Sequence, residues 1–321
     1  MINMKKKKLL PALFVSAASA WVIGTQSLFS LASRRRSLLY RIPRPRKKAP
    51  DAPPDELEAF VAAYQERIHA MKLKKITMRS RDGLTLAAHW YPAENACRTI
   101  VLVHGWRSAW DRDFAGITDY LHDGGANLLF IEQRAHGESE GAYIAFGLLE
   151  RFDVEDWVKK LPEFSDPTLP VYLFGVSMGA STVLMASALP LPPSVQGIVA
   201  DCGYTSPSAI IRNTVVRNTV LPAFAEKGAG LRMRLHTGFD YDAYSTLDAV
   251  RRSHIPMLFV HGDADTFVPV SMSYQNYAAC CAPKSLLIVH GARHAMSYIV
   301  DPDAYRRKVE QLFSLYRKPE K

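Results

Sequence analysis

A serine between two glycines is the residue of this 321-residue chain whose setting most clearly permits chemistry. Residues 175–179 read Gly-Val-Ser-Met-Gly, with Ser177 at the centre. The four residues before this motif are apolar, as in a buried strand, and residues 180–186 have the composition of a helix. A Gly-x-Ser-x-Gly motif between a strand and a helix is typical of a nucleophile elbow, a sharp turn that exposes the serine oxygen. Ser177 is therefore the candidate nucleophile.

A serine hydroxyl is a weak nucleophile near neutral pH, so it needs a base, and the base needs an acid that orients it. His294, on a loop after the last apolar run, is the candidate base, and Asp265, after an earlier run, is the candidate acid. Their close rivals are His290, which directly adjoins the apolar run, and Asp263, which suits a turn. Asp201, at the end of another apolar run, is a further candidate acid.

Acyl transfer also needs hydrogen-bond donors for the negative oxygen of the tetrahedral intermediate. The backbone N–H of Met178, directly after the nucleophile, is one candidate. The loop His104-Gly105-Trp106 follows the first inner apolar run and supplies the other, the backbone N–H of Trp106. His104 and His136, each next to a glycine, are predicted to shape their loops rather than to transfer protons.

Short apolar runs alternate with helix-like segments over most of the chain. The first two runs flank Ser80-Arg81-Asp82-Gly83, whose Asp-Gly pair suits a hairpin turn. The later runs have consecutive Val, Ile and Leu, as in strands buried on both faces. The predicted strands are Lys75–Arg79, Leu84–Tyr91, Thr99–Val103, Asn127–Ile131, Val171–Phe174, Gly197–Ala200, Met257–Val260 and Ser285–Val289. The predicted helices are Glu56–Met71, Phe114–His122, Leu149–Lys160, Met178–Ala188, Leu247–Arg252, Ser271–Ala279 and Asp303–Tyr316.

This alternation predicts an α/β fold, in which helices flank a mostly parallel eight-stranded sheet within one domain over residues 56–321. Residues 204–241 make a longer connection than such a fold requires. This segment is apolar with four interspersed arginines, and we predict a short helical insertion that serves as a lid. Its apolar residues favour acyl or aromatic substrate groups over sugars.

An uncharged run from Leu9 to Ser33 lies between Lys5–Lys8 and Arg34–Arg36. As a helix it would span roughly 37 Å, enough to cross the apolar core of a bilayer, which is about 30 Å thick. Residues 1–36 are therefore predicted to be a single-pass N-terminal transmembrane anchor that places the protein at the cell membrane. A cleaved signal sequence, with its site near Ala20, is the alternative and would give a secreted form. The basic flanks do not decide the side of the membrane on which the rest of the chain lies.

The formal net charge of +9 is concentrated near the N-terminus. Residues 1–50 hold twelve of the 40 Lys and Arg residues and no Asp or Glu, so the other 28 face 31 acidic residues. This distribution argues against nucleic-acid binding. Residues 37–55, which are basic and rich in proline, are predicted to be an extended linker lying against anionic lipid headgroups.

The cysteines and the metal-binding motifs give little sign of a bridged or metal-dependent protein. Four cysteines, Cys97, Cys202, Cys280 and Cys281, are too few for a disulfide framework in a chain of this length, and two of them are sequence neighbours. No Cys-x-x-Cys or His-Glu-x-x-His motif occurs in the sequence. We therefore predict no metal and no cofactor.

Taken together, these motifs resemble those of the α/β-hydrolase superfamily. The motifs are His104-Gly105-Trp106, Arg134–Ser139, Gly175–Gly179, His261–Asp265 with Val268-Pro269, and Gly291–Ala295. The chain looks most like bacterial membrane-tethered serine hydrolases near the prolyl-oligopeptidase-like and serine-aminopeptidase-like groups. One loop departs from the pattern: many relatives read Asp-x-Arg-Gly-His-Gly, where this chain has Glu132 and Ala135.

The residues and the resemblance lead to the same expectation for function. The protein is predicted to be a serine hydrolase that cleaves small-molecule carboxylic esters through an acyl-enzyme intermediate on Ser177. A peptidase or a thioesterase would use the same triad and is an alternative within the same class. A non-catalytic, membrane-tethered binding protein on this scaffold is the alternative from another class.

Overall fold

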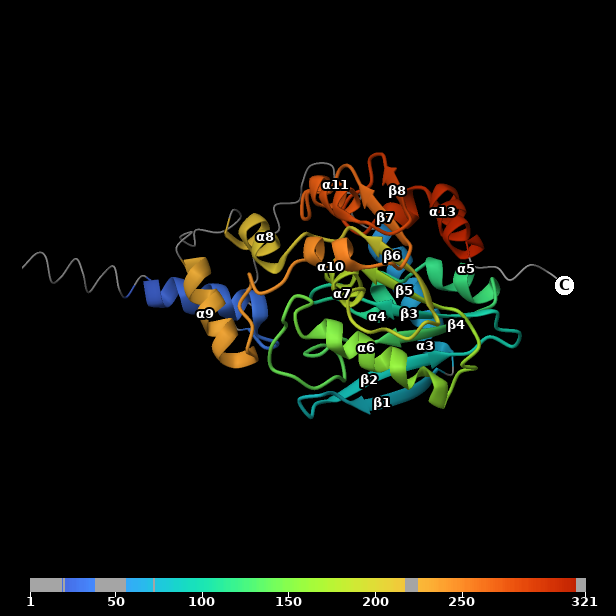
Figure 1. Ribbon diagram of the computed structural model, residues 1–321, viewed down its shortest axis with the longest axis horizontal. Coiled ribbons are helices and arrows are strands. Elements are labelled where there is room, and N and C mark those ends of the chain that lie inside the picture. Colours follow the sequence, from blue (N-terminus) through green and yellow to red (C-terminus); the bar gives the residue numbers. More distant parts are fainter. Residues whose placement is uncertain (1–18, 20, 38–55, 72, 217–224, 316–321) are drawn as a thin grey trace, which may run out of the picture.

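The computed structural model describes residues 19, 21–37, 56–71, 73–216 and 225–315. Its centre is an eight-stranded sheet with the order β1-β2-β4-β3-β5-β6-β7-β8 (Figure 1). The strands are β1 (Lys74–Arg79), β2 (Thr85–Tyr91), β3 (Arg98–Val103), β4 (Ala126–Ile131), β5 (Val171–Val176), β6 (Val195–Asp201), β7 (Met257–Gly262) and β8 (Lys284–Val289). β2 runs antiparallel to β1 and β4, and the other neighbouring pairs are parallel. The predicted mostly parallel eight-stranded sheet is confirmed.

The parallel strands end at one edge of the sheet. Val103 of β3 pairs with Gly175 of β5, and Asp201 of β6 pairs with Val260 of β7, so these strands finish almost level. The loops that follow them therefore converge. Ligands of open α/β sheets bind at this carboxyl edge, where the loops bring distant residues together.

Helices cover both faces of the sheet. They are α3 (Glu56–Ala70), α4 (Trp110–Asp113), α5 (Ile117–Asp123), α6 (Glu150–Lys160), α7 (Met178–Ala186), α8 (Pro207–Ile211), α9 (Ala225–Thr237), α10 (Thr246–Arg252), α11 (Val270–Ala279), α12 (Ser297–Val300) and α13 (Pro302–Ser314). Side chains alternate along a strand, so Ile100 and Leu102 of β3 pack under α3, α5 and α13, and Val101 and Val103 pack under α6 and α7. Both faces of the central strands are thereby buried, which explains their unbroken apolar runs.

One predicted helix, Phe114–His122, is wrong in its form. The structure has two short helices instead, α4 and α5, and Gly116 lies between them. Gly116 has a φ of +88°, which lies outside the helical region and ends any continuous helix through this position.

The N-terminal part of the chain packs against the domain. Residues 21–33 are helical, and we refer to them as helix 21–33. Its side chains at Leu28, Phe29, Leu31 and Ala32 are buried in a cluster with α9 and with residues 144–148. Figure 1 shows this helix beside α9, at the end of the molecule away from α13.

The predicted transmembrane anchor therefore finds no support in the structure. Among the described residues, no helix has both the length and the apolar character needed to cross a bilayer. The first 18 residues of the predicted anchor, and the predicted linker beyond Ser37, lie outside the described part of the chain. The described part of the predicted insertion, 204–216 and 225–241, contains α8, a π-helical turn at Arg212–Val216, and α9. Its role as a lid stays a prediction.

Candidate active site

The candidate nucleophile lies in a tight turn between β5 and α7. Ser177 has a φ of +56° and a ψ of −115°, a conformation that residues with a side chain rarely adopt. The turn is possible because its two glycines lie where no side chain fits. A Cβ at Gly179 would be 1.8 Å from the carbonyl oxygen of Val103, and one at Gly175 would be 2.3 Å from Gly179. The Gly-x-Ser-x-Gly motif thus has the strand-turn-helix setting that the sequence predicts.

The structure brings together the three residues predicted as a triad. His294 Nε2 lies 3.0 Å from Ser177 Oγ, and His294 Nδ1 lies 2.6 Å from Asp265 Oδ2. Asp265 lies on the loop after β7 and His294 on the loop after β8. With Nδ1 protonated and bound to the carboxylate, Nε2 is left to accept the serine proton. This is the order of contacts that activates a serine.

The carboxylate of Asp265 is held in its charged form. Its side chain is fully buried, and Oδ1 accepts hydrogen bonds from the backbone N–H groups of Phe267 and Val268. His261 Nε2 lies 3.1 Å from Oδ2, the same oxygen that His294 contacts. Burial alone would raise the pKa of Asp265, but the hydrogen bonds from His261 and His294 outweigh it and place this pKa below its usual value.

The rival candidates for the base and the acid make contacts away from Ser177. His290 Nδ1 lies 2.7 Å from Asp263 Oδ2, and the two form a pair at the surface, where the His290 side chain is 98% exposed. Asp201 is buried and accepts hydrogen bonds from Ser297 Oγ and Tyr305 Oη. Burial raises the pKa of Asp201 to about 6.

The loop after β3 runs directly beside the nucleophile. A Cβ added to Gly105 would lie 3.2 Å from Ser177 Cβ. The N–H of Gly105 donates to Asp113 Oδ2 at 2.6 Å, and the N–H of Arg107 donates to His136 Nε2 at 3.0 Å. These two bonds fix the peptide groups on either side of Trp106, whose N–H is a predicted oxyanion donor.

The other predicted donor, the N–H of Met178, belongs to the first residue of α7, where backbone N–H groups have no partner within the helix. The helix dipole adds a partial positive charge at the same place. A negative oxygen next to Ser177 would therefore be stabilised.

The two histidines predicted to shape loops are buried and bound to backbone groups. His104 Nε2 accepts from the N–H of Gln133, and His104 Nδ1 lies 2.8 Å from the carbonyl oxygen of Gly105. His136 Nδ1 lies 2.9 Å from the carbonyl oxygen of Arg134. Burial lowers the pKa of both, that of His136 to about 3, so both rings are neutral at ordinary pH.

A cavity of about 400 Å³ opens at Ser177 and His294. Much of its wall is apolar, including Val61 of α3, Phe114 directly after α4, and Ile299 of α12. Arg112 and Asp113 add charged groups. None of the described residues of the 204–241 insertion is among the lining residues. The described insertion instead packs on helix 21–33.

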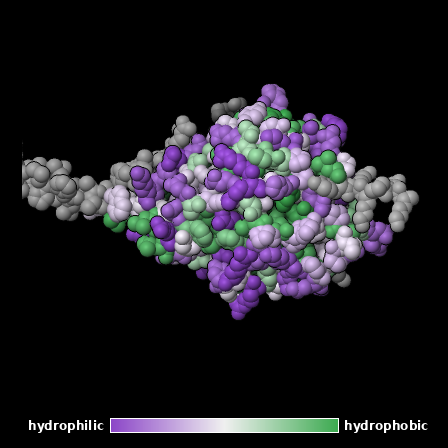
Figure 2. All heavy atoms as spheres, in the orientation of Figure 1, coloured by the Kyte–Doolittle hydropathy of each residue, from purple (hydrophilic) through white to green (hydrophobic). Residues whose placement is uncertain are grey.

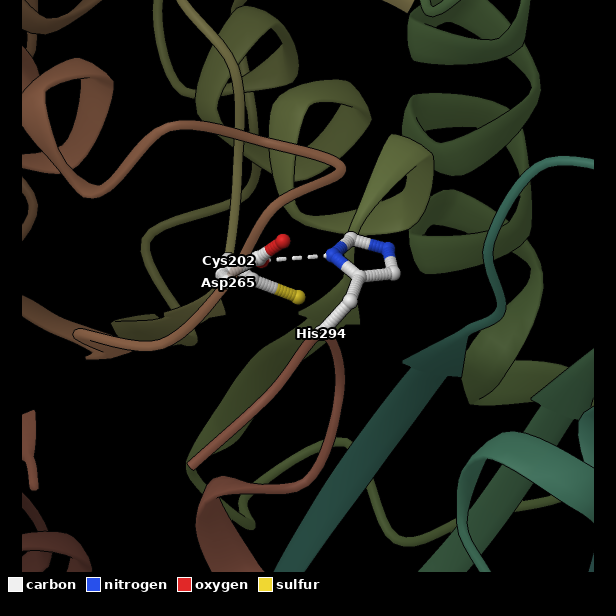
Figure 3. Close-up of side chains that lie close together, drawn as sticks. All are labelled: Cys202, Asp265 and His294. Carbon is white, nitrogen blue, oxygen red and sulfur yellow. Dashed lines mark hydrogen bonds and ion pairs between the residues drawn. The ribbon is translucent and has the colours of Figure 1, made fainter. Parts of the chain in front are cut away.

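Two groups of side chains among the described residues are close enough together to share a metal ion. One, Cys202, Asp265 and His294, overlaps the triad (Figure 3). Burial raises the pKa of the Cys202 thiol well above its usual value, so the sulfur keeps its proton and is a poor metal ligand. The other group is His89, Glu132 and Glu138, in which His89 Nε2 already binds Glu132 Oε1 at 2.9 Å.

Sequence comparisons place relatives of this chain in several bacteria. The model of the serine aminopeptidase family S33 matches residues 94–246. The chain is 25% identical to the protein YqkD of Bacillus subtilis over 250 residues, which cover 77% of this chain and 81% of YqkD. It is 26% identical to Rv2307c of Mycobacterium tuberculosis over 242 residues, 73% of this chain and 78% of that protein.

Solved structures with the same fold include esterases and peptidases. The esterase Pf2001 of Pyrococcus furiosus superimposes with a TM-score of 0.64 at 20% identity, over 78% of this chain and 94% of the esterase. The chain has the α/β-hydrolase fold. Est1E of Butyrivibrio proteoclasticus, solved with ferulic acid, gives a TM-score of 0.59 at 17% identity, over 75% of this chain and 100% of Est1E. A puromycin-hydrolyzing peptidase of M. tuberculosis gives 0.56 at 17% identity, over 75% of this chain and 38% of the peptidase.

Two contacts at the site are not predicted from the sequence. His261 was noted only as part of a motif, yet its ring binds the candidate acid. Val61 lies within the predicted helix Glu56–Met71, which carries no predicted role in the site, yet it lines the cavity. The contact of His261 is local, because Asp265 lies only four residues later in the turn that ends β7. The position of Val61 has no local sequence signal, because only the folded sheet brings α3 to the cavity.

Proposed function

We propose that this protein is a serine esterase in which Ser177, His294 and Asp265 form the catalytic triad. The observation that carries the proposal is the pair of hydrogen bonds that joins the three, 3.0 Å from Ser177 Oγ to His294 Nε2 and 2.6 Å from His294 Nδ1 to Asp265 Oδ2. The superfamily and the esterase neighbours favour the same chemistry.

The reaction proceeds in two halves. Ser177 Oγ attacks the ester carbonyl carbon while His294 Nε2 takes the hydroxyl proton, and Asp265 stabilises the resulting imidazolium. The carbonyl oxygen becomes an oxyanion and accepts hydrogen bonds from the N–H groups of Trp106 and Met178. The tetrahedral intermediate collapses, the alcohol leaves with the proton from His294, and an acyl-enzyme remains. Water, deprotonated by His294, then attacks the acyl carbon and releases the acid and Ser177.

The size and lining of the cavity favour an ester whose acyl part is a small or medium aliphatic or aromatic group. A volume of about 400 Å³ and an apolar wall that includes Val61, Phe114 and Phe174 suit such a group. We therefore expect short and medium acyl chains to react faster than long ones.

Peptidase activity is the second candidate, because the matched family model is that of a serine aminopeptidase. Asp113 and Asp201 lie in the cavity wall and would suit a substrate amine. A thioesterase would use the same steps with a thiolate as leaving group.

We also propose that the N-terminal segment contacts a lipid bilayer, at the cell membrane. The apolar residues Trp21, Val22 and Ile23 are exposed at the start of helix 21–33, and Leu231 and Leu235 are exposed on α9. Figure 2 shows hydrophobic surface at this end of the molecule. Trp at such a position is typical of a membrane interface. Flotation of the full chain with anionic vesicles, and loss of flotation in a Trp21→Ser and Ile23→Ser double variant, would test the contact.

A fluorophosphonate probe tests the esterase proposal. The activated serine oxygen displaces fluoride from phosphorus, so the wild type should be labelled and Ser177→Ala should not. Ser187→Ala, which removes another buried serine that follows α7, should be labelled like the wild type. Labelling of Ser177→Ala would refute Ser177 as the nucleophile. No labelling of the wild type would favour the alternative of a non-catalytic binding protein.

A substrate panel then separates the activities. The wild type should hydrolyse 4-nitrophenyl esters of increasing acyl length, matched thioesters and aminoacyl 4-nitroanilides at different rates. The proposal expects the highest kcat/KM for esters. A preference of tenfold or more for the anilides would make the protein a peptidase.

A further inference from the structure

The C-terminal end of helix 21–33 is bound by two consecutive residues of the loop after β3. Trp106 Nε1 donates to the carbonyl oxygen of Ala32 at 2.9 Å. The guanidinium of Arg107 donates to three more carbonyl oxygens, those of Leu31 at 3.1 Å, Arg34 at 2.6 Å and Arg35 at 3.2 Å. The last carbonyl groups of a helix lack partners within it, and a cation there also offsets the negative end of the helix dipole. Arg107 therefore caps helix 21–33.

The same two residues are the ones that shape the oxyanion site. Trp106 carries the proposed donor N–H, and Arg107 follows it with a φ of +53°, in the left-handed region that a residue with a side chain seldom adopts. The backbone N–H of Arg107 is fixed by His136. On its far side, the Trp106 ring stacks on Phe267, and Phe267 in turn contacts the ring of His294. A shift of the Trp106–Arg107 pair would thus move both the donor and the wall beside the base.

Helix 21–33 is itself held firmly to the domain. Phe29 packs on Tyr143 and on His236, and Ser33 Oγ binds Tyr241 Oη at 2.8 Å. After the helix ends, the N–H of Arg35 donates to the carbonyl oxygen of Ala142 at 2.9 Å, and the N–H of Ile144 donates to that of Ser33 at 2.7 Å. The helix is therefore a fixed support to which Trp106 and Arg107 are bonded.

We propose that helix 21–33 is a positioning element of the active site, which holds the Trp106 N–H in place for the oxyanion through its bonds to Trp106 and Arg107. Stabilisation of an oxyanion depends steeply on donor position, and a displacement of about 1 Å can cost on the order of 100-fold in rate. Loss of the helix contact should lower kcat more than it raises KM, because the donor acts on the charge that develops in the transition state. The inference rests on the proposed esterase function.

The test compares full-length variants on both sides of the contact. Phe29→Asp puts a charge into the buried face of the helix and should detach it, whereas Ile23→Asp makes a similar change at an exposed position of the same helix and serves as the matched control. Arg107→Met removes the cap from the other side, and Arg107→Lys keeps the charge with fewer donors. For Phe29→Asp and Arg107→Met we expect kcat to fall about 10- to 100-fold with KM within threefold of the wild type. Ile23→Asp should match the wild type, and Arg107→Lys should lie between.

Two further measurements separate positioning from a general loss of structure. The affinity of a trifluoromethyl ketone, which forms an oxyanion on Ser177, should fall in parallel with kcat. The double variant Phe29→Asp/Arg107→Met should be hardly slower than either single variant, because both remove the same support. Circular dichroism checks that each variant is folded. If Phe29→Asp is not folded, the activities of Arg107→Met and Trp106→Phe test the role of the helix contact without it.

Failure of the proposed role of helix 21–33 and failure of the proposed esterase function give different results. A folded Phe29→Asp variant, or an Arg107→Met variant, with the kcat and ketone affinity of the wild type overturns the inference and leaves the esterase intact. Additive losses in the double variant also overturn it, since Arg107 would then act independently of the helix. A wild type that neither reacts with fluorophosphonate nor hydrolyses esters refutes the function, and the inference falls with it.

Discussion

His261 and His294 bind the same oxygen atom of Asp265, at 3.1 Å and 2.6 Å. A second contact of His261 shows which ring nitrogen donates. Its Nε2 also lies 2.9 Å from the carbonyl oxygen of Val268, which can only accept, so Nε2 carries a proton, and Nδ1 lies 2.6 Å from Ser273 Oγ. His261 is therefore a donor that keeps Asp265 charged and correctly placed for His294.

Replacing His261 by Phe should weaken catalysis and change its pH dependence. The ring volume is kept, but Asp265 loses a donor, so its pKa rises. A carboxylate with fewer donors attracts the proton on the base more strongly, so the acid limb of the kcat/KM profile, which reports protonation of the base, moves to higher pH. We expect kcat to fall about tenfold, in line with the loss of a hydrogen bond to a charged group. Ser273→Ala touches only the far nitrogen of His261 and should have a smaller effect. An unchanged acid limb in His261→Phe would show that Asp265 does not depend on this donor.

The two Asp–His pairs at the ends of β7 and β8 offer a matched comparison. Asp265→Asn and His294→Ala should each lower kcat/KM by about 10³-fold or more, because the base loses its orientation or is absent. Asp263→Asn and His290→Ala alter the exposed pair only and should leave kcat/KM within twofold of the wild type. Steady-state rates on one 4-nitrophenyl ester measure all four. Similar losses in both pairs would contradict the assignment of base and acid.

Asp201 should make the free energy of unfolding depend on pH. Its pKa in the folded protein, about 6, lies above its ordinary value of 3.8, so the folded state binds this proton more tightly than the unfolded state does. The free energy of unfolding of the wild type should therefore gain from this group as the pH falls from 7 through 6 towards 4, and lose that gain as the pH rises again. Asp201→Asn cannot titrate, so relative to the wild type it should be more stable at pH 7 than at pH 4.5. Urea unfolding at both pH values measures this, and a difference that does not vary with pH would contradict it.

The two glycine positions Gly179 and Gly291 should respond very differently to alanine. A methyl group at Gly179 would overlap the carbonyl oxygen of Val103, and neither backbone can move without opening the elbow. We expect Gly179→Ala to give no folded protein. Gly291 also has a positive φ, +74°, but open space surrounds it, so Gly291→Ala should cost only about 1–2 kcal/mol of stability. Soluble yield and thermal unfolding measure both, and a normally stable Gly179→Ala would show that the turn is less tight than described.

The strands were predictable because the physics that selects them is local. β3 to β7 are almost wholly buried, so their apolar runs are continuous and stand out from amphipathic helices. Ser177 and Asp265 could be proposed because they lie just after two of these strands, β5 and β7, and His294 because it lies on the loop after the last apolar run, β8. The structure was needed to place Asp265 and Asp263, two residues apart in one loop, in their different surroundings.

Helix 21–33 shows where sequence reasoning reaches its limit. An uncharged, apolar run is equally suited to lipid and to a protein interior, because both environments lack water. Leu28, Phe29 and Ala32 would satisfy either one. Only the folded domain reveals that Arg107 and Trp106, more than 70 residues later, bind the end of this run.

The hydrogen bonds from Arg107 to the carbonyl oxygens of residues 31, 34 and 35 limit how far this protein can be truncated from its N-terminus. A recombinant fragment that starts at α3, chosen to discard a hydrophobic leader, would keep Ser177, His294 and Asp265 intact. It would nevertheless take four main-chain acceptors away from Trp106 and Arg107 and strip the covering from Tyr143 and Tyr241. Low activity or aggregation of such a fragment would result from the loss of helix 21–33 and would not reflect the activity of the full chain.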